Sequence, residues 1–265
     1  MKISIITCVY NNVATIERAL LSVVLQDYPH IEYIVLDGGS TDGSQAIIEK
    51  YTANIAVYRS EKDGGLYPAI NKGISLCSGD YIGLVHADDF LMNSNTITQI
   101  VNAIDHESNL PEVVSGNVVF FRSEANRLRI TRKYKSSGFR MWHFRFGIMP
   151  AHTASFVRRT SYEHWGNYRS DFVIAADFEF FVRIHRKVQH WLFLPQEVVA
   201  MEVGGISTQN SRSNLIISQE IIRLLKLHNV KTHWLLFIPK YALKALRLIP
   251  YRLLSWYVTD WTTKR

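Results

Sequence analysis

The sequence predicts an α/β protein whose central sheet is doubly wound and mostly parallel. Apolar strand-like runs alternate with helical patterns through the first 90 residues, and clusters of polar residues follow the ends of the apolar runs. Strands that alternate with helices join as parallel neighbours, because each helix returns the chain across one face of the sheet. With 265 residues, of which 47% are apolar and 20% charged, the chain has the composition of an ordinary folded protein.

The spacing of apolar residues defines the first elements. Residues 2–9 are an apolar run typical of a buried strand. The apolar residues that follow have the i, i+3, i+4 spacing of one helix face: Ile16, Ala19, Leu20, Val23 and Val24. Residues 31–37 predict a second strand that ends on Asp37, and we expect Thr41 or Asp42 to cap the next helix.

The alternation of strands and helices continues to residue 85. Beyond it, strands and helices no longer alternate regularly. Helices are predicted over 45–51 and 66–77, and strands over 55–58 and 81–85. Beyond them we predict helices over 94–104, 175–185 and 215–227, and strands over 113–121, 128–131, 154–157, 191–194 and 198–202. These later strands predict a smaller mixed sheet beside the parallel one. A helical tail with breaks at Pro239 and Pro250 follows.

Cysteine usage and the amino terminus favour a reducing compartment. Cys8 and Cys77 lie on segments predicted to be buried, which favours free thiols over a disulfide framework. The first residues lack the long apolar region of a secretory signal, and no apolar run is long enough to span a bilayer. We therefore expect a cytoplasmic protein.

The positive charge is concentrated at the carboxyl end. The whole chain carries +7, but the part after Glu220 holds nine Lys or Arg and one acid, which gives it +8 and leaves −1 for the rest. The high isoelectric point therefore describes the tail and does not indicate a nucleic-acid partner.

The stretch Tyr81–Leu91 holds the first candidate site. An apolar strand here delivers His86, Asp88 and Asp89 at its carboxyl end, where ligands bind in open α/β sheets. Two adjacent carboxylates suit Mg²⁺ or Mn²⁺, which in turn favours a substrate that carries phosphate. The alternative is a turn in which one of the two acids caps the following helix.

Two other loops are expected at the same edge of the sheet: residues 9–11 and residues 37–40. Asp37 can accept hydrogen bonds from a nucleobase or ribose, or it can hold the backbone amides of its own turn. The first strand is followed by neither GxGxxG nor GxxxxGK[ST], so a dinucleotide-binding fold and a P-loop are both disfavoured.

The motifs ITCVYNN, VLDGGSTDGS, SEKDGGLYPAINKGI and GDYIGLVHADD, in this order, resemble the family 2 glycosyltransferases. The resemblance is closest to bacterial members that build capsular and other surface polysaccharides, and AADFEFFVRI and MEVGGIS extend it. It implies a GT-A fold, a nucleotide-sugar donor that is UDP-linked, Mn²⁺ or Mg²⁺, and inversion at the anomeric carbon. We expect a catalytic domain over 1–230, with a nucleotide-binding half over 1–90 and an acceptor half over 91–230, and a basic amphipathic helical tail over 231–265.

The same resemblance assigns expected roles to individual residues on the donor side. Val9 and Tyr10 should border the nucleobase, and Asp37 should hold its edge. Asp88 should bind the metal, and His86, which stands where such enzymes usually have Asp or Asn, should contact the ribose. Three residues fall in the segment that flanks ribose and phosphates: Asp63, Asn71 and Lys72. Pro68 stands where an acid is common and receives no chemical role.

On the acceptor side we expect Asp177 to be the catalytic base. It lies just inside a predicted helix, flanked by the small residues Ala175 and Ala176, and partial burial would raise its basicity. The alternative for Asp177 is an acid at a helix N-terminus, favoured by the helix dipole. Glu179, two positions later, points elsewhere and is the weaker candidate. His152 and Trp142 are expected as acceptor contacts, His152 alternatively on the metal side; core packing is the alternative for the aromatic segment around Trp142.

Two alternatives to a sugar transferase remain at this stage. A sugar-nucleotide pyrophosphorylase shares the need for nucleotide and metal, but it predicts a basic Gly-rich loop where this chain has VYNNVAT. A non-catalytic glycan-binding or scaffold protein of the same fold has no need for Asp37, Asp88 and Asp177 together.

The tail has no acid from Ile221 to Thr259 and mixes Lys and Arg with aromatic residues and leucines. This composition predicts either contact with an anionic membrane, where a polyprenyl-linked acceptor would lie, or a helix packed on the catalytic domain.

Overall fold

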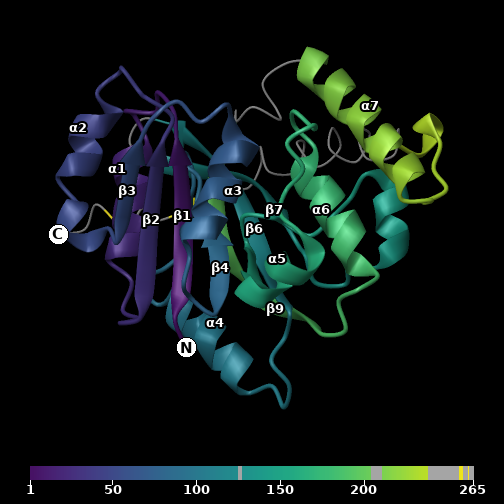
Figure 1. Cartoon of the computed structure of the whole chain (residues 1–265), viewed down its shortest axis with the longest axis horizontal. Helices are drawn as coiled ribbons and strands as arrows, with labels where there is room; N and C mark the ends of the chain where they lie inside the picture. Colours follow the sequence, from purple (N-terminus) through teal and green to yellow (C-terminus); the bar gives the residue numbers. More distant parts are fainter. Residues whose placement is uncertain (125–126, 204–210, 238–256, 259–261, 263–265) are drawn as a thin grey trace.

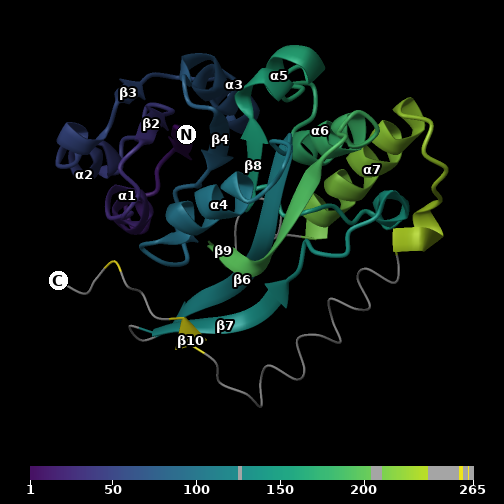
Figure 2. The same ribbon diagram turned by 90° about the horizontal axis from the view of Figure 1, so that it is seen from below.

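A mixed sheet separates two layers of helices (Figures 1 and 2). The computed structural model describes residues 1–124, 127–203, 211–237, 257–258 and 262. Its strands are β1 (Ile3–Val9), β2 (Ile31–Asp37), β3 (Val57–Ser60), β4 (Tyr81–Leu84), β5 (Phe90–Leu91), β6 (Val113–Glu124), β7 (Arg127–Tyr134), β8 (Ser155–Arg158), β9 (Trp191–Glu202) and β10 (Tyr257–Val258). Its helices are α1 (Ile16–Val24), α2 (Ser44–Glu49), α3 (Leu66–Leu76), α4 (Thr96–Asp105), α5 (Arg159–Trp165), α6 (Ala176–His185) and α7 (Ser211–Leu227), with short 3₁₀ segments η1 (Thr52–Asn54), η2 (Met141–Phe146) and η3 (Trp234–Phe237).

The first four strands form the predicted parallel unit. They lie in the spatial order β4-β1-β2-β3, and Ile3 of β1 pairs with Ile31 of β2 on one side and with Tyr81 of β4 on the other. The chain thus builds outward from β1 through β2 to β3 and then returns to place β4 on the opposite side of β1. The order reverses between β1 and β4, which is the position where open α/β sheets form their ligand crevice.

Alternation along the strands divides the core into two parts. In β1, Ile3 and Ile5 face the layer of α1, α2 and α4, whereas Ile6 and Cys8 face α3. Figure 2 shows α1 and α2 on one side of the parallel strands and α3 and α5 on the other. Each fully buried aliphatic side chain contributes about 1.5–3 kcal/mol relative to exposure. The strand faces that alternation predicts to be apolar are therefore the faces on which the apolar sides of the helices pack.

A glycine permits close packing where β4 meets the second half of the chain. A Cβ atom at Gly83 would lie 2.4 Å from Cε1 of Phe156, a fully buried residue of β8. Gly83 therefore lets the Phe156 ring lie directly across β4. Since β4 leads into residues 86–89, this contact also fixes the direction in which that loop leaves the sheet.

The strands of the second half extend the same sheet. β8 pairs antiparallel with β4, placing Val157 opposite Ile82, and β6 pairs with both β8 and β9. The α/β fold class is confirmed, and the smaller set of strands is continuous with the parallel unit. The two strands predicted over 191–194 and 198–202 are one strand, β9, with an irregular register opposite Asn117. There the Asn117 side-chain amide donates to the carbonyl oxygen of Pro195, at 2.6 Å.

Several local expectations were wrong. Gly43, with φ 101°, is the N-cap residue of α2 in place of Thr41 or Asp42, while the Asp42 carboxylate accepts from the amide of Ser44, the first residue of α2, at 3.0 Å and from the amide of Val13 at 2.8 Å. Helix α5 and strand β5 were missed, because both are too short to show a period. Residues 257–258, expected to be helical, form β10, which pairs antiparallel with β7. The predicted helix breaks at Pro239 and Pro250 lie outside the described residues.

The two cysteine thiols are free and buried, as predicted. Burial raises the pKa of the Cys77 thiol to about 12. Among the residues that the structure describes, no helix has the length and apolar character needed to cross a membrane.

Candidate active site

The reversal of strand order between β1 and β4 brings the predicted loops together at one edge of the sheet. Asn11, which follows β1, has the left-handed φ of 47° that Asn tolerates, and its amide nitrogen donates to Ser40 Oγ at 2.8 Å. The amide of Thr41 donates in return to Asn11 Oδ1 at 2.9 Å. These two hydrogen bonds fix the loop after β1 against the loop after β2.

Asp37 holds its own turn. Its carboxylate accepts hydrogen bonds from the amides of Gly39 and Ser40, from Ser60 Oγ at 2.6 Å and from the Gln45 side chain. The structure thus shows the turn carboxylate that was the alternative for this residue. Only the amide of Ser40 contacts Oδ1, so this oxygen retains the capacity to accept a further hydrogen bond.

Tyr10, Gly38 and Asp63 lie together beside this turn. A Cβ atom at Gly38 would come within 3.2 Å of Asp63 Oδ2 and 3.3 Å of Tyr10 Cδ2. The Tyr10 ring is 67% exposed, whereas Val9, the last residue of β1, is buried. The predicted nucleobase residues therefore form an open aromatic surface above a buried strand end, next to a carboxylate.

Two residues predicted to flank the phosphates have other partners. Both ends of the Asn71 amide bind the backbone of Tyr168, one donating to its carbonyl oxygen at 2.7 Å and the other accepting from its amide at 3.0 Å. Asn71 thus joins α3 to the segment before α6. Lys72 forms an ion pair with Glu61 on the molecular surface.

The two acids after β4 have different environments. Asp89 is buried, its Oδ1 accepts from the amide of Glu202 at 3.3 Å, and its Oδ2 has no partner. Burial, and then the charge of Asp88, raise the pKa of Asp89 well above its ordinary range. Among the described residues, the Asp88 carboxylate makes no hydrogen bond, and it is partly exposed. Neither acid caps a helix, because β5 follows directly and α4 begins only after Asn95.

Arg18 of α1 holds the loop after β4, which carries Asp88. Its guanidinium donates to the carbonyl oxygen of Asp88 at 3.3 Å and to the Glu202 carboxylate at 2.7 Å. The same group lies over the rings of Phe90 and Phe121, 5.2 and 4.8 Å from their centroids. Sequence reasoning missed Arg18, because an arginine inside an amphipathic helix carries no signal of a partner 70 residues away.

The donor set at this loop suits a divalent cation that is shared with a ligand. Within the described residues no cluster of three or more His, Cys, Asp or Glu side chains forms a complete metal cage. Mg²⁺ and Mn²⁺ are commonly held by one or two carboxylates together with substrate phosphates and water. Asp88, partly exposed and without a hydrogen-bond partner, fits this mode.

Asp177 lies at the start of α6 and faces this loop through a pair of histidines. Its Oδ2 is 3.2 Å from His152 Nδ1, and His152 Nε2 is 3.2 Å from His86 Nε2. The hydroxyl of Tyr67, on α3, donates to Asp177 Oδ1 at 3.4 Å and to the carbonyl oxygen of Ile174 at 2.6 Å. Tyr67 from α3, His152 from the segment before β8 and Asp177 itself from α6 thus lie together, although they come from three separate segments of the chain.

Burial controls protonation in this cluster. The Asp177 side chain is 13% exposed, and burial raises its pKa to about 6, while hydrogen bonds from the amide of Phe178 and from Tyr67 act in the opposite direction. Burial also lowers the pKa of His86 and His152 to about 4. Near pH 7 the group therefore contains an ionised carboxylate and two neutral imidazoles.

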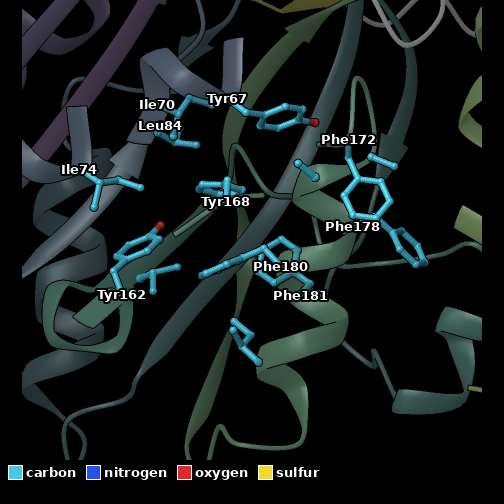
Figure 3. Packing of buried hydrophobic residues seen from close by; sticks show 14 of the residues in the cluster. Tyr67, Ile70, Ile74, Leu84, Tyr162, Tyr168, Phe172, Phe178, Phe180 and Phe181 are labelled. Atoms are coloured by element: carbon cyan, nitrogen blue, oxygen red, sulfur yellow. The ribbon is translucent and has the colours of Figure 1, made fainter. Parts of the chain in front are cut away.

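The start of α6 is held by an acid from α7. The Glu220 carboxylate accepts hydrogen bonds from three consecutive backbone amides, those of Val173, Ile174 and Ala175, at 2.8, 3.0 and 2.9 Å. These amides precede Asp177 directly. Figure 3 shows Phe180 of α6 packed beside Tyr162 and Tyr168, with Phe181 next to it. The backbone that carries Asp177 is thus fixed by hydrogen bonds at one end and by aromatic packing along the helix.

The remaining predicted residues lie apart from this cluster. Glu179 is fully buried and binds Arg183 and His228, which confirms that it points away from Asp177. The Trp142 ring is 55% exposed and stacks on His143, with 3.8 Å between the ring centroids. Phe144 is buried in the core, as expected for an aromatic segment that packs.

Comparison with known proteins identifies relatives over most of the chain. A family model described as Glycosyl transferase family 2 matches residues 4–166. An uncharacterized glycosyltransferase of Mycobacterium tuberculosis is 33% identical over 185 residues, covering 68% of each chain. The PGL/p-HBAD biosynthesis glycosyltransferase of Mycobacterium bovis is 27% identical over 228 residues, covering 84% of this chain and 83% of that protein.

Solved structures show the same fold. S. aureus TarS 1–349 in complex with UDP-GlcNAc aligns with a TM-score of 0.66 at 17% identity, covering 95% of this chain and 72% of that one. The mannosyltransferase PcManGT from Pyrobaculum calidifontis, in complex with GDP-Man and Mn²⁺, aligns with a TM-score of 0.57 at 16% identity, covering 95% and 82%. Two other TarS chains are matched over 65% and 40% of their length. The predicted GT-A fold is confirmed.

Replacing Glu220 should loosen the backbone in front of Asp177. In Glu220→Gln the amide retains one acceptor oxygen, so part of the three-amide cluster loses its partner, at a cost of about 1–3 kcal/mol in the free energy of unfolding. Urea denaturation measures this loss, and hydrogen exchange should show faster exchange at the amides of residues 173–175. Glu163→Gln is the control, because that exposed i, i+4 pair with Arg159 contributes at most about 0.5 kcal/mol. Equal stability of the two variants would contradict the role given to Glu220.

Proposed function

Because the chain belongs to glycosyltransferase family 2, we propose that it transfers a sugar from a UDP-sugar to a lipid-linked glycan acceptor, with inversion at the anomeric carbon. The observation that carries this proposal is the convergence of the buried Asp177 carboxylate on the loop that holds Asp88. A base and a metal-binding acid at one crevice are what a transferase of this type requires. A protein that only binds glycan has no need of a carboxylate whose pKa is raised towards neutrality.

The donor would lie across the carboxyl ends of β1, β2 and β4. Tyr10 would stack on the base, and the free capacity of Asp37 Oδ1 would accept a hydrogen bond from its edge. Asp63 would face the ribose, and His86 would lie between ribose and acceptor. The TarS complex with UDP-GlcNAc supports a UDP-linked donor through the shared fold.

A divalent cation would bind at Asp88 together with the diphosphate. The PcManGT complex with Mn²⁺ supports this assignment by fold. When bound, the cation supplies charge neutralisation for the departing diphosphate. Lys72, which lies on α3 and is paired with Glu61, is retained as a second source of positive charge near that diphosphate.

Asp177 would act on the acceptor. Its carboxylate is ionised near pH 7 and buried, so it can take the proton from an acceptor hydroxyl as that oxygen attacks C1 of the sugar. The C1–oxygen bond to the diphosphate breaks as the new bond forms on the opposite face, and UDP leaves. Direct attack from the opposite face gives inversion in a single step.

The acceptor is proposed to be a glycan carried on a lipid such as a polyprenyl diphosphate. A relative over most of the chain is likewise a biosynthetic glycosyltransferase, named for PGL/p-HBAD biosynthesis. Trp142, exposed on η2, provides an aromatic surface on which a sugar ring can stack. With such an acceptor and a basic tail over 231–265, the enzyme would act at the inner face of the cell membrane, with the catalytic domain over 1–230.

Removing the proposed base should abolish transfer without weakening donor binding. Asp177→Asn should reduce turnover by about 10²–10⁴-fold, because the amide cannot accept a proton, while affinity for UDP stays unchanged. In the wild-type protein, turnover should fall as the pH drops below about 6, where Asp177 becomes protonated. Turnover is measured as UDP released from UDP-GlcNAc, UDP-glucose and UDP-galactose, and affinity by calorimetry. Asp171→Asn, six residues earlier and exposed, is the control. Wild-type turnover in Asp177→Asn would refute the assignment.

Removing the proposed metal ligand should eliminate the effect of metal on UDP binding. Calorimetry of the wild-type protein should show tighter UDP binding with Mn²⁺ than without it. Asp88→Asn should bind UDP equally with and without Mn²⁺, because the amide is a poor ligand for a hard cation. Asp105→Asn, an exposed acid at the end of α4, should behave as wild type. If Asp88→Asn kept the full gain from Mn²⁺, another residue would hold the metal.

Membrane contact through the tail should depend on its basic residues. Lys240, Lys244 and Arg247 recur at i, i+4 and i+7 and share one face if that segment is helical. Each basic residue near an anionic surface contributes about 1 kcal/mol, so replacing all three by Gln should sharply reduce cosedimentation with phosphatidylglycerol vesicles. The control is a chain in which Lys50, Arg122 and Lys187, all exposed elsewhere, are replaced by Gln. Equal sedimentation of both variants would leave the tail without a membrane role.

A further inference from the structure

His152 lies between the carboxylate of Asp177 and the loop after β4. It precedes β8, and its imidazole is 20% exposed. Nδ1 is 3.2 Å from Asp177 Oδ2, and Nε2 is 3.2 Å from His86 Nε2, with 5.5 Å between the two ring centroids. Both nitrogens of one ring are therefore engaged, each by a residue from a different part of the fold.

The positions of the protons follow from these two contacts. A neutral imidazole carries one N–H and one bare nitrogen. An ionised carboxylate only accepts, so His152 must present its N–H at Nδ1 to Asp177. His152 Nε2 is then the acceptor, and His86 donates to it from its own Nε2–H. The His86 contact thus stabilises the tautomer of His152 that Asp177 requires.

The contacts also fix how the carboxylate is turned. Asp177 Oδ1 accepts from the amide of Phe178 at 2.7 Å and from Tyr67, while Oδ2 lies 3.2 Å from His152 Nδ1. Without a partner on Oδ2, the carboxylate could rotate about its Cβ–Cγ bond. A proton acceptor must hold its lone pair within a few tenths of an ångström of the reacting hydroxyl, and a displacement of about 1 Å can cost about 10²-fold in rate.

We propose that His152 is a positioning residue for the transfer step, holding the Asp177 carboxylate through Nδ1–H while His86 sets its tautomer. This inference rests on the proposed function in one respect, because it takes Asp177 to be the base. It goes beyond the acceptor or metal-side contact expected for His152. Its geometric part, the 3.2 Å contact between His152 Nδ1 and Asp177 Oδ2, stands on the structure alone.

Two substitutions separate the two nitrogens of the ring. The amide nitrogen of Asn is two bonds from Cβ, as Nδ1 is, whereas that of Gln is three bonds away, as Nε2 is. His152→Asn should keep the donor to Asp177 and turn over UDP-sugar near the wild-type rate. His152→Gln loses that donor, so turnover should fall by about 10²-fold. Its acidic pH limb should also move to higher pH, because the ionised carboxylate is less stabilised. His190→Gln is the control, since His190 also lies 3.2 Å from a carboxylate, that of Glu107.

The opposite order of activity would overturn the proposal. If His152→Gln were active and His152→Asn inactive, the Nε2 position would be the functional one, as for a metal ligand or an acceptor contact. Equal losses in both variants, with UDP affinity and the urea midpoint unchanged, would also overturn it, because the Nδ1 position would then have no special role.

A measurement that needs no activity separates this proposal from the proposed function. In ¹⁵N-histidine NMR spectra at pH 7, the imidazole signal that is lost in His152→Asn should have the Nδ1–H tautomer, and the same signal should change in Asp177→Asn. An Nε2–H tautomer for His152 would refute the positioning role. If the tautomer is as expected but Asp177→Asn retains turnover, the contact exists and the assignment of Asp177 as base is what fails.

Discussion

Burial of the Asp177 carboxylate is the constraint on which the arrangement of the site depends. An ionisable group removed from water must find hydrogen-bond donors or lose its charge, because an unpaired buried charge costs several kcal/mol. Here the donors come from α3 through Tyr67 and from α6 itself, and His152, in the segment before β8, lies 3.2 Å from Oδ2. Burial raises the pKa of the carboxylate, and the hydrogen bonds from Phe178 and Tyr67 oppose this rise, so that the group stays ionised near neutral pH. One polar cluster thereby links the early part of the chain to the late part, and the extended sheet makes the link rigid, since β8 is hydrogen-bonded directly to β4.

The helices behind the site add a second level of support. Glu220 acts as an N-terminal anion for α6, although it belongs to another helix, and negative charge is favoured at that end of a helix dipole. Arg18 has a similar part on the other side, where it joins α1, the loop after β4 and the end of β9. Both residues lie outside the crevice. The loop that holds Asp88 and the helix start that holds Asp177 are therefore fixed by hydrogen bonds and an ion pair from residues behind them.

Much of the fold could be predicted from the sequence, because its signals are local. The period of apolar residues in α1 and the apolar run of β1 each lie within a dozen positions, and the rule for parallel crossovers then brings the strand ends together. The loop that carries Asp88 and the helix that carries Asp177 were found in this way, and the family resemblance supplied their expected roles. Residues whose function is a long-range contact could not be found. The sequence predicts Asn71 to be a polar residue near the crevice, yet its side chain binds the backbone of Tyr168, 97 positions away. Tyr67 lies in the helix predicted over 66–77, and no local pattern in the sequence indicates that its hydroxyl contacts Asp177.

The pairing of β10 with β7 has a consequence for biosynthesis of the protein. Tyr257 lies opposite Arg129, a residue more than a hundred positions earlier, so this edge of the sheet is completed only after residues 257–258 have left the ribosome. Until then β7 presents unpaired backbone donors and acceptors along its outer side, and such edges are templates for pairing with other chains. Arg127, Arg129, Arg132 and Lys133 lie along this strand. Repulsion between these charges on neighbouring nascent chains would protect the open edge during synthesis.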